Sequence, residues 1–159
     1  MGDDRPRPVP VNVVLLEPEI HFNTGNIGRT CVGTGSSLHL VGTLGFSLDS
    51  AQIRRSGLDY WPKLDLKLYS DWDSFLTAVG ADAPLLFFSA EARTDFWDAP
   101  YEPSCYLVFG KESTGLPEAL RAQYQDRLFR IPKNADIRSY NLSSSAAIVL
   151  FEGLRRFRN

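Results

Sequence analysis

Six short apolar runs alternate with helix-compatible segments along the chain, and this alternation constrains the fold more than any other feature. Runs of this length, bounded by turn residues, are typical of buried strands. Strands that alternate with helices predict an α/β fold with a mostly parallel sheet and helices on both faces. The predicted strands are Val11–Leu16, Leu38–Gly42, Leu66–Tyr69, Pro84–Ser89, Ser104–Phe109 and Leu128–Ile131.

Five further segments favour helices, and the last of them is unusual. Its stretch Ala146–Phe151 is apolar without a break, so the helix is apolar nearly all round. A terminal helix of a small domain should show a polar face. We therefore expect a homodimer in which the C-terminal helix is buried against a second subunit. The predicted helices are Gly25–Gly33, Asp49–Ser56, a helix capped by Ser70 or Asp71 that runs to about Val79, Leu116–Tyr124 and Leu142–Phe157.

Length and composition fit one domain. The chain has 159 residues, of which 43% are hydrophobic, enough for one core. We expect residues 1–10, with three prolines, to be a flexible tail and residues 11–159 to form the single domain. No apolar run has the length of a membrane span and the first residues have no secretory pattern, so we expect no membrane association.

Cysteines and histidines give no sign of a metal site. The two cysteines, Cys31 and Cys105, are far apart and lack CxxC spacing. His21 and His39 have no neighbours that resemble metal ligands. We therefore expect no metal and a reducing, cytoplasmic location.

Charge is distributed unevenly along the chain. The net charge is −2, but the segment Arg127–Asn159 has seven basic and two acidic side chains, a balance of +5. Such a segment could hold a phosphate backbone, and we expect Arg138, Arg155 and Arg156 to contact RNA if RNA is the partner. Arginines near the C-terminus of a helix also suit the helix dipole. Charge by itself favours that second interpretation.

Three polar loops follow predicted strands, where parallel sheets bind ligands. In the first, Asn23–Thr30, a helix start would offer free N–H groups to an anion, with Arg29 about one turn into the helix. An ordinary helix start with a surface arginine explains this segment equally well. In the second, Gly110–Pro117, Glu112 and the glycines could line a small-molecule pocket. Judged alone, that loop favours a tight turn capped by Ser113 or Thr114.

The third loop, Ile131–Ser145, follows the last strand and leads into the apolar helix. It holds a dense polar group that includes Arg138, Ser139, Asn141 and Ser143. Serines at positions 143–145 are good N-terminal helix residues, and plain capping explains one of the three. We expect the remaining polar side chains of this loop to serve a site.

Taken together and in this order, the three loops resemble the three motifs of the SPOUT RNA methyltransferases. The similarity is greatest to the minimal, single-domain branch that methylates the wobble ribose of tRNA, and it runs from about Val11 to Arg156. It includes LEPEIHFNTGNIGRT, LGF…RRSGLDY, LVFGKESTGLP and IPKNADIRSYNLSSSAAIVLFEGLRR. The chain departs from the branch at Ser144, where Asn is common.

The resemblance implies a cytoplasmic, homodimeric enzyme whose C-terminal segment is threaded into a deep trefoil knot. The implied cofactor is S-adenosylmethionine, the implied substrate is tRNA, and the acceptor is a cytidine or uridine 2′-hydroxyl at position 34. The donor residues it implies are Phe88, Gly110, Glu112, Ile131, Ser139 and Leu142. The catalytic residues it implies are Arg29, Asn23, Asn141 and Ser143.

The implied reaction is displacement at the sulfonium methyl, which needs in-line positioning and removal of the hydroxyl proton. A guanidinium stays protonated in proteins, so Arg29 suits a phosphate anchor better than a base. We expect a side chain at Gly110 to obstruct the donor while the fold survives. Alternatives are a ribose methyltransferase for another tRNA or rRNA site, a non-catalytic RNA-binding or adenosyl-ligand-binding module, and an unrelated α/β nucleotide-binding protein.

Overall fold

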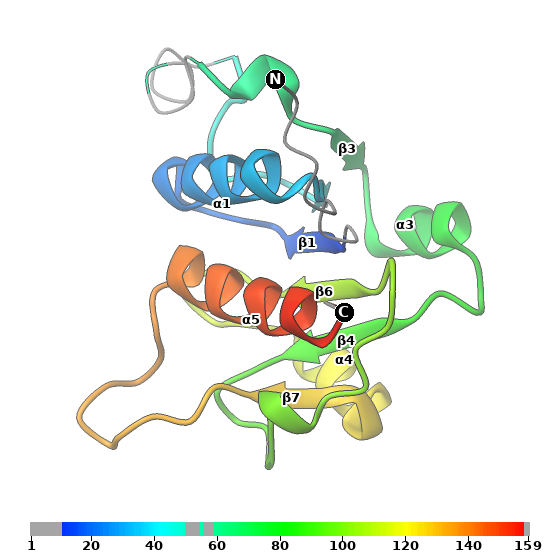
Figure 1. The fold of residues 1–159 in the computed structure, drawn as a ribbon, viewed down its shortest axis with the longest axis vertical. Helices are drawn as coiled ribbons and strands as arrows, with labels where there is room; N and C mark the ends of the chain where they lie inside the picture. Colours follow the sequence, from blue (N-terminus) through cyan, green and yellow to red (C-terminus); the bar gives the residue numbers. More distant parts are fainter. Residues whose placement is uncertain (1–10, 50–54, 56–58, 158–159) are drawn as a thin grey trace.

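The structure, a computed structural model, describes residues 11–49, 55 and 59–157. Within these residues, seven strands form one sheet in the order β3-β2-β1-β6-β4-β7-β5, and every neighbouring pair is parallel (Figure 1). The predicted α/β class is confirmed. The strands are β1 Asn12–Leu16, β2 Ser37–Val41, β3 Leu66–Tyr69, β4 Leu85–Phe88, β5 Thr94–Asp95, β6 Tyr106–Phe109 and β7 Leu128–Arg130.

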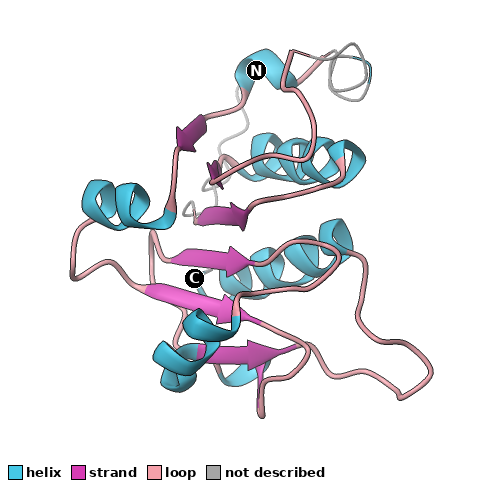
Figure 2. Cartoon of the chain, turned by 180° about the vertical axis from the view of Figure 1, so that it is seen from behind, coloured by secondary structure: helices cyan, strands magenta, loops and turns pink. Residues whose placement is uncertain are grey.

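Helices cover both faces of the sheet, as predicted. On one face α1 (His21–Thr34) and α5 (Leu142–Phe157) lie side by side (Figure 1). The opposite face, seen in Figure 2, carries α3 (Trp72–Val79) and α4 (Glu118–Gln123). Three short 3₁₀ helices complete the described elements: η1 Trp61–Lys63, η2 Phe96–Asp98 and η3 Gln125–Arg127.

Two apolar cores result, one on each face of the sheet. Ile27 and Val149 belong to the core under α1 and α5, together with Leu107 of β6. Phe75 of α3 and Leu120 of α4 belong to the other core. Strand residues that alternate between the two cores explain why the central strands β4 and β6 are apolar at every position.

Several predicted boundaries are correct and others are wrong. Helix α5 begins and ends where predicted, and Asp71 caps α3 by accepting a hydrogen bond from the Ser74 amide at 2.7 Å. Helix α1 begins four residues before the predicted Gly25. No side chain caps α4 at its N-cap Pro117, so the predicted Ser113 or Thr114 cap is wrong. The predicted tail 1–10 lies outside the described residues, as does most of the predicted helix 49–56.

Both cysteines are buried and unpaired, Cys31 on α1 and Cys105 just before β6. Burial raises the pKa of the Cys31 thiol to about 12, and it also raises the pKa of the Cys105 thiol. Among the described residues no group of His, Cys, Asp or Glu side chains is arranged to hold a metal ion. None of the helices in that part of the chain is long and apolar enough to cross a bilayer.

Candidate active site

A cavity of about 470 Å³ opens at the carboxyl ends of β4, β6 and β7. Because parallel strands all point the same way, the loops that follow them meet at one edge of the sheet. The start of α1 and the start of α5 also contribute side chains to its wall. All six predicted donor residues line this cavity: Phe88, Gly110, Glu112, Ile131, Ser139 and Leu142.

The lining of the cavity combines apolar and polar side chains. Phe88, whose ring stacks on Phe109 at 5.2 Å between centroids, lies beside Ile131 and Leu142 in the lining. The polar part of the lining includes Asn23 and Asn141. Apolar walls with a few convergent polar groups are typical of small-molecule sites.

The loop that follows β6 folds back tightly on itself. Its ends pair where the Gly115 amide donates to the Lys111 carbonyl oxygen at 2.8 Å, and Gly115 has a φ of 72°. A Cβ atom at Gly110 would lie 2.0 Å from the carbonyl carbon of Gly115 and 2.1 Å from the amide nitrogen of Leu116. A side chain at Gly110 would therefore collide with the backbone of its own loop, which would have to shift. The expected obstruction of the donor with a surviving fold stays a prediction.

A carboxylate of the same chain, that of Glu112, already binds the backbone amides just before α1. The Glu112 carboxylate accepts hydrogen bonds from the amides of Glu19 at 2.7 Å and Ile20 at 3.2 Å, and from the Asn23 side chain at 3.4 Å. The predicted free N–H groups are thus partly occupied, as helix N-termini favour a carboxylate. Glu112 lines the cavity as predicted, but its carboxylate holds the loop after β6 against α1.

Three of the four predicted catalytic residues meet at the rim of the cavity. The Asn141 amide group donates to Asn23 Oδ1 at 3.1 Å. Asn141 Oδ1 accepts from the Ser143 amide at 2.8 Å, from the Ser143 hydroxyl at 2.6 Å and from the Ser144 amide at 3.3 Å. Asn141 is therefore the cap of α5, and the predicted serine cap is wrong.

Sequence reasoning missed Glu19, which contacts the second loop directly and is linked to the third loop only through Ser113. Its Oε1 accepts from the Ser113 amide at 2.9 Å and from the Ser113 hydroxyl at 2.6 Å. The Ser113 carbonyl oxygen in turn accepts from Arg138 Nη2 at 2.9 Å. The Ser113 hydroxyl is the main reason why the pKa of Glu19 lies below its usual value. A lone glutamate beside Pro18 carries no sequence signal for this role.

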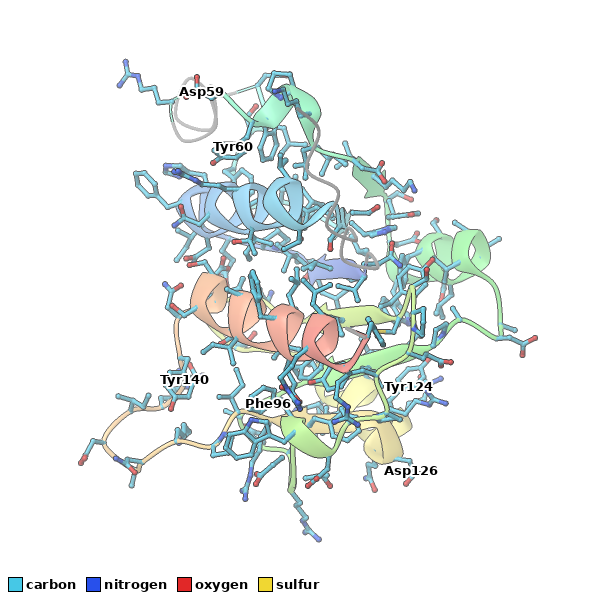
Figure 3. All side chains as sticks on the ribbon, viewed as in Figure 1. Asp59, Tyr60, Phe96, Tyr124, Asp126 and Tyr140 are labelled. Atoms are coloured by element: carbon cyan, nitrogen blue, oxygen red, sulfur yellow. The ribbon has the colours of Figure 1, made fainter. Side chains whose placement is uncertain are left out.

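The loop between β7 and α5 is tied to itself and to its neighbours. Tyr140, labelled in Figure 3, donates its hydroxyl proton to the Pro132 carbonyl oxygen at 2.8 Å. Lys133 donates to the Ile137 carbonyl oxygen at 3.0 Å. Lys133 and Arg138 both line the cavity, so cationic groups lie at its rim.

Arg29 lies apart from the cavity within one chain. It is exposed on α1, about two turns from the helix start rather than the one turn predicted. Its guanidinium lies 5.9 Å from the centre of the Tyr60 ring, and the Tyr60 hydroxyl donates to the Gly25 carbonyl oxygen at 2.9 Å. The structure therefore does not bring Arg29 to the Asn23–Asn141 pair.

Arg155 and Arg156, predicted to contact RNA, lie near the C-terminus of α5 and outside the cavity lining. Arg155 binds both carboxylate oxygens of Glu152, at 2.9 and 2.8 Å, and lowers the pKa of that carboxyl. Arg156 donates to the Trp97 carbonyl oxygen at 2.9 Å. Both have partners within the chain, and their RNA role stays a prediction.

Comparison with known proteins identifies the family of the chain. The model of the SpoU rRNA Methylase family matches residues 10–151. The chain belongs to this family. A relative from Burkholderia pseudomallei, named tRNA (cytidine(34)-2′-O)-methyltransferase, is 43% identical over 147 residues, which are 91% of this chain and 94% of the relative. A relative from Synechocystis is 45% identical over 151 residues, which are 94% of this chain and 98% of the relative.

Several solved structures share this fold. One, described as giving structural insights into the 2-OH methylation of C/U34 on tRNA, has a TM-score of 0.89 and 38% identity. The match covers 94% of this chain and 97% of that one. An AdoMet-bound rRNA methyltransferase from Sinorhizobium meliloti has the same fold at a TM-score of 0.83 and 24% identity. The match covers 97% of this chain and 59% of the Sinorhizobium chain.

Proposed function

We propose that the chain is an S-adenosylmethionine-dependent tRNA 2′-O-ribose methyltransferase that acts on cytidine or uridine 34. The observation that carries this proposal is the contact between Asn23 and Asn141, 118 positions apart, at the rim of a cavity lined by all six predicted donor residues. Relatives and a solved structure named for this reaction cover more than nine tenths of the chain. A rRNA substrate is the second candidate, favoured only by the description of the family.

The cavity fits S-adenosylmethionine in its chemistry. Phe88, Ile131 and Leu142 form an apolar wall suited to a flat adenine, and Gly110 and Ser139 offer backbone groups beside it. When bound, this donor supplies a methyl group on a positively charged sulfur. Loss of that charge during transfer means that the chain need not supply a strong electrophile, so positioning of the acceptor hydroxyl matters most.

Asn23 and Asn141 are the groups best placed to position a ribose. Both line the cavity, and their mutual hydrogen bond fixes the orientation of both amides. Glu112 is occupied by three N–H donors, and Ser143 is occupied at the cap of α5. We infer that these two residues hold the asparagine pair in place rather than exchange a proton with the substrate.

Arg29 is proposed to act on the RNA. Its exposed position on α1 and its distance from the cavity lining favour contact with a target phosphate over contact with the donor. A guanidinium binds phosphate in a bidentate manner and stabilises a developing negative charge. We propose the same kind of contact for Arg138 at the rim, and a weaker contribution for Arg155 and Arg156.

A homodimer through α5 is also proposed. Two large apolar side chains on the outer surface of α5, Ile148 and Phe151, are 40% and 57% exposed, and Phe22 of the adjacent α1 is 61% exposed. Side chains of this size on two adjacent helices are typical of a contact between subunits. Phe151→Glu should produce monomers in sedimentation equilibrium, whereas a monomeric native protein at micromolar concentration would disprove the dimer.

We further propose that the chain is knotted near its C-terminus. The support is the path of the chain, which leaves β7 near one edge of the sheet and returns to pack α5 against α1 and β6. On the way, Arg138 contacts the loop after β6. A knotted chain stretched from its ends in optical tweezers should be shorter than its residue count allows at about 3.5 Å per residue. Full extension would exclude the knot.

We also propose a cytoplasmic location, since tRNA and two buried, unpaired cysteines both suit a reducing compartment.

The reaction will be tested by incubating total tRNA and rRNA with the protein and methyl-labelled donor, and then mapping the modified ribose. Label on the 2′-oxygen of nucleotide 34 is the expected result. Label in rRNA or at another tRNA position would show that the proposed substrate is wrong, and absence of transfer would reject the proposed methyltransferase activity.

A further inference from the structure

Glu19 and the loop after β6 bind each other reciprocally. The amide of Glu19 donates to Glu112, and the carboxylate of Glu19 accepts from the next residue, Ser113, at both its amide and its hydroxyl. The two distances to Ser113, 2.9 and 2.6 Å, are those of good hydrogen bonds to a charged acceptor. Ser113 therefore has a fixed orientation although it lies on an exposed loop.

The orientation of Ser113 determines where Arg138 points. The carbonyl oxygen of Ser113 accepts the Nη2 donor of Arg138 at 2.9 Å. No acidic side chain among the described residues pairs with Arg138, and a guanidinium has five N–H donors. Most of these donors stay available at the rim of the cavity, where Arg138 is exposed.

We propose that Glu19 is a positioning residue for RNA binding, acting through Ser113 to hold Arg138 ready for a phosphate of the RNA. The inference rests on the proposed RNA substrate and adds to it a residue that never contacts the RNA. It also predicts a change in RNA affinity opposite to the one that charge repulsion alone would give. A surface carboxylate near bound RNA repels phosphate, so its removal should tighten binding, whereas removal of Glu19 should weaken it.

The test compares tRNA affinity across salt concentrations for the native protein, Glu19→Ala, Arg138→Ala and the double variant. Glu19→Ala keeps the amide that binds Glu112, so the contact of the loop with α1 remains. We expect Glu19→Ala and Arg138→Ala each to bind tRNA several-fold more weakly and to lower the salt slope by about 1. The double variant should bind no more weakly than Arg138→Ala, since both act through one guanidinium.

Two controls separate positioning from charge and from damage to the fold. Asp95→Asn removes one negative charge from an ion pair with Arg130 outside the cavity lining, and should not weaken binding. Glu19→Gln keeps an acceptor oxygen for Ser113 and should bind tRNA with intermediate affinity. Donor affinity in calorimetry should stay native in the two Glu19 variants, which a distorted cavity would not allow, and circular dichroism should show that both stay folded at the assay temperature.

The outcomes distinguish this inference from the proposed function. Equal or tighter tRNA binding by Glu19→Ala, an unchanged salt slope, or additive losses in the double variant would each overturn the role of Glu19 while methylation by the native protein stands. If the native protein transfers no methyl group to nucleotide 34, yet binds tRNA in a way that depends on Glu19 and Arg138, the reaction is wrong and the positioning role is correct.

Discussion

Asn141 and His39 each belong to a small group of hydrogen-bonded polar side chains, but the two groups have different roles. Asn141 belongs to a loop network at the carboxyl ends of the strands, and His39 belongs to a strand network inside the sheet. The loop network consists of Glu19, Asn23, Glu112, Ser113, Arg138 and Asn141. The strand network consists of Asn12, His39 and Tyr69.

The strand network is neutral and enclosed. His39 is 2% exposed, with the Tyr69 hydroxyl 2.9 Å from its Nδ1 and Asn12 Oδ1 3.1 Å from its Nε2. Rings of Phe75 and Tyr106 lie edge-on to it at 6.0 and 5.5 Å. Burial lowers the pKa of His39 to about 4. Because a buried polar group without a partner is costly, these hydrogen bonds stabilise the sheet. None of the three residues lines the cavity.

The loop network, by contrast, is charged, half exposed and built around a cavity. Its carboxylates bind backbone amides of neighbouring loops, so it fixes the shape of the cavity wall rather than the core. The difference teaches that polar side chains within the strands form a structural network, whereas those in the loops at the carboxyl ends of the strands form a functional one. Mutations in the first network should act on stability, and mutations in the second on RNA binding and methyl transfer.

Asn141 gives the largest expected effect. Asn141→Ala should reduce methyl transfer by about 100-fold, because small errors in ribose position cost that much, and should lower stability by about 1 kcal/mol through loss of the α5 cap. Asn141→Asp keeps the capping oxygen but cannot donate to Asn23. It should therefore be as inactive as Asn141→Ala, but with the stability of the native protein. Single-turnover rates and denaturant melts will separate the two effects. An active Asn141→Asp would remove the asparagine pair from the mechanism.

Substitution of Arg29 should also reduce methyl transfer, by a somewhat smaller factor than substitution of Asn141. Arg29→Ala and Arg29→Lys should both keep donor binding and thermal stability, yet lose most methyl transfer, because Lys lacks the planar fork of a guanidinium. An anchor predicts weaker productive RNA binding with an unchanged pH profile. A rate that climbs with pH and depends on residue 29 would instead indicate a base. Near-native turnover of Arg29→Ala would exclude both roles.

His39→Phe should break the strand network and leave the chemistry intact. It leaves the Tyr69 hydroxyl and Asn12 Oδ1 without partners, at a cost of roughly 1–3 kcal/mol each, while the rate at 25 °C stays native. Since the folded pKa of about 4 is below the ordinary 6.5, the unfolded chain binds the proton first as pH falls. Native stability should therefore drop between pH 6.5 and 4 by up to roughly 3 kcal/mol.

The matching measurement is urea unfolding of both proteins across that pH range. His39→Phe cannot take up this proton, so its stability should change less with pH than that of the native protein. Parallel pH curves for the two proteins would mean that His39 titrates normally in the folded state. A large loss of activity in His39→Phe at 25 °C would contradict the separation of the two networks.

Arg155 and Arg156 should give the smallest effect. Both already have partners in Glu152 and Trp97, so the double Gln variant should change tRNA affinity less than Arg138→Ala does. Filter binding at two salt concentrations will measure the difference. A loss equal to that of Arg138→Ala would show that these side chains leave their partners for RNA.

The sequence predicts the elements of this fold well where the signal is local. Apolar runs identified six of the described strands, and Leu142–Phe157 was placed without error because the polar loop changes abruptly to apolar residues. The strand Thr94–Asp95 was missed because two polar residues carry no apolar period. The start of α1 was missed because Glu112, about 90 residues away, satisfies the N–H groups that precede it.

The site was predictable in its members but not in their contacts. Loop composition and motif order identified six residues that all line one cavity, and their contact with the donor stays a prediction. No local pattern says that Asn141 caps α5 and also donates to Asn23, or that Gly110 lies against the backbone of Gly115. Such contacts depend on how loops from distant strands meet, which only the assembled sheet determines.

The burial of both cysteines makes the chain a convenient background for spectroscopy. Cys31 and Cys105 are fully buried, and thiols with raised pKa values react slowly with maleimides or methanethiosulfonates. A single cysteine introduced at exposed Ile137, on the loop between β7 and α5, should therefore take up a spin label or fluorophore selectively. Distances from that label to one on the tRNA would then follow the loop during a catalytic cycle without replacement of either native thiol.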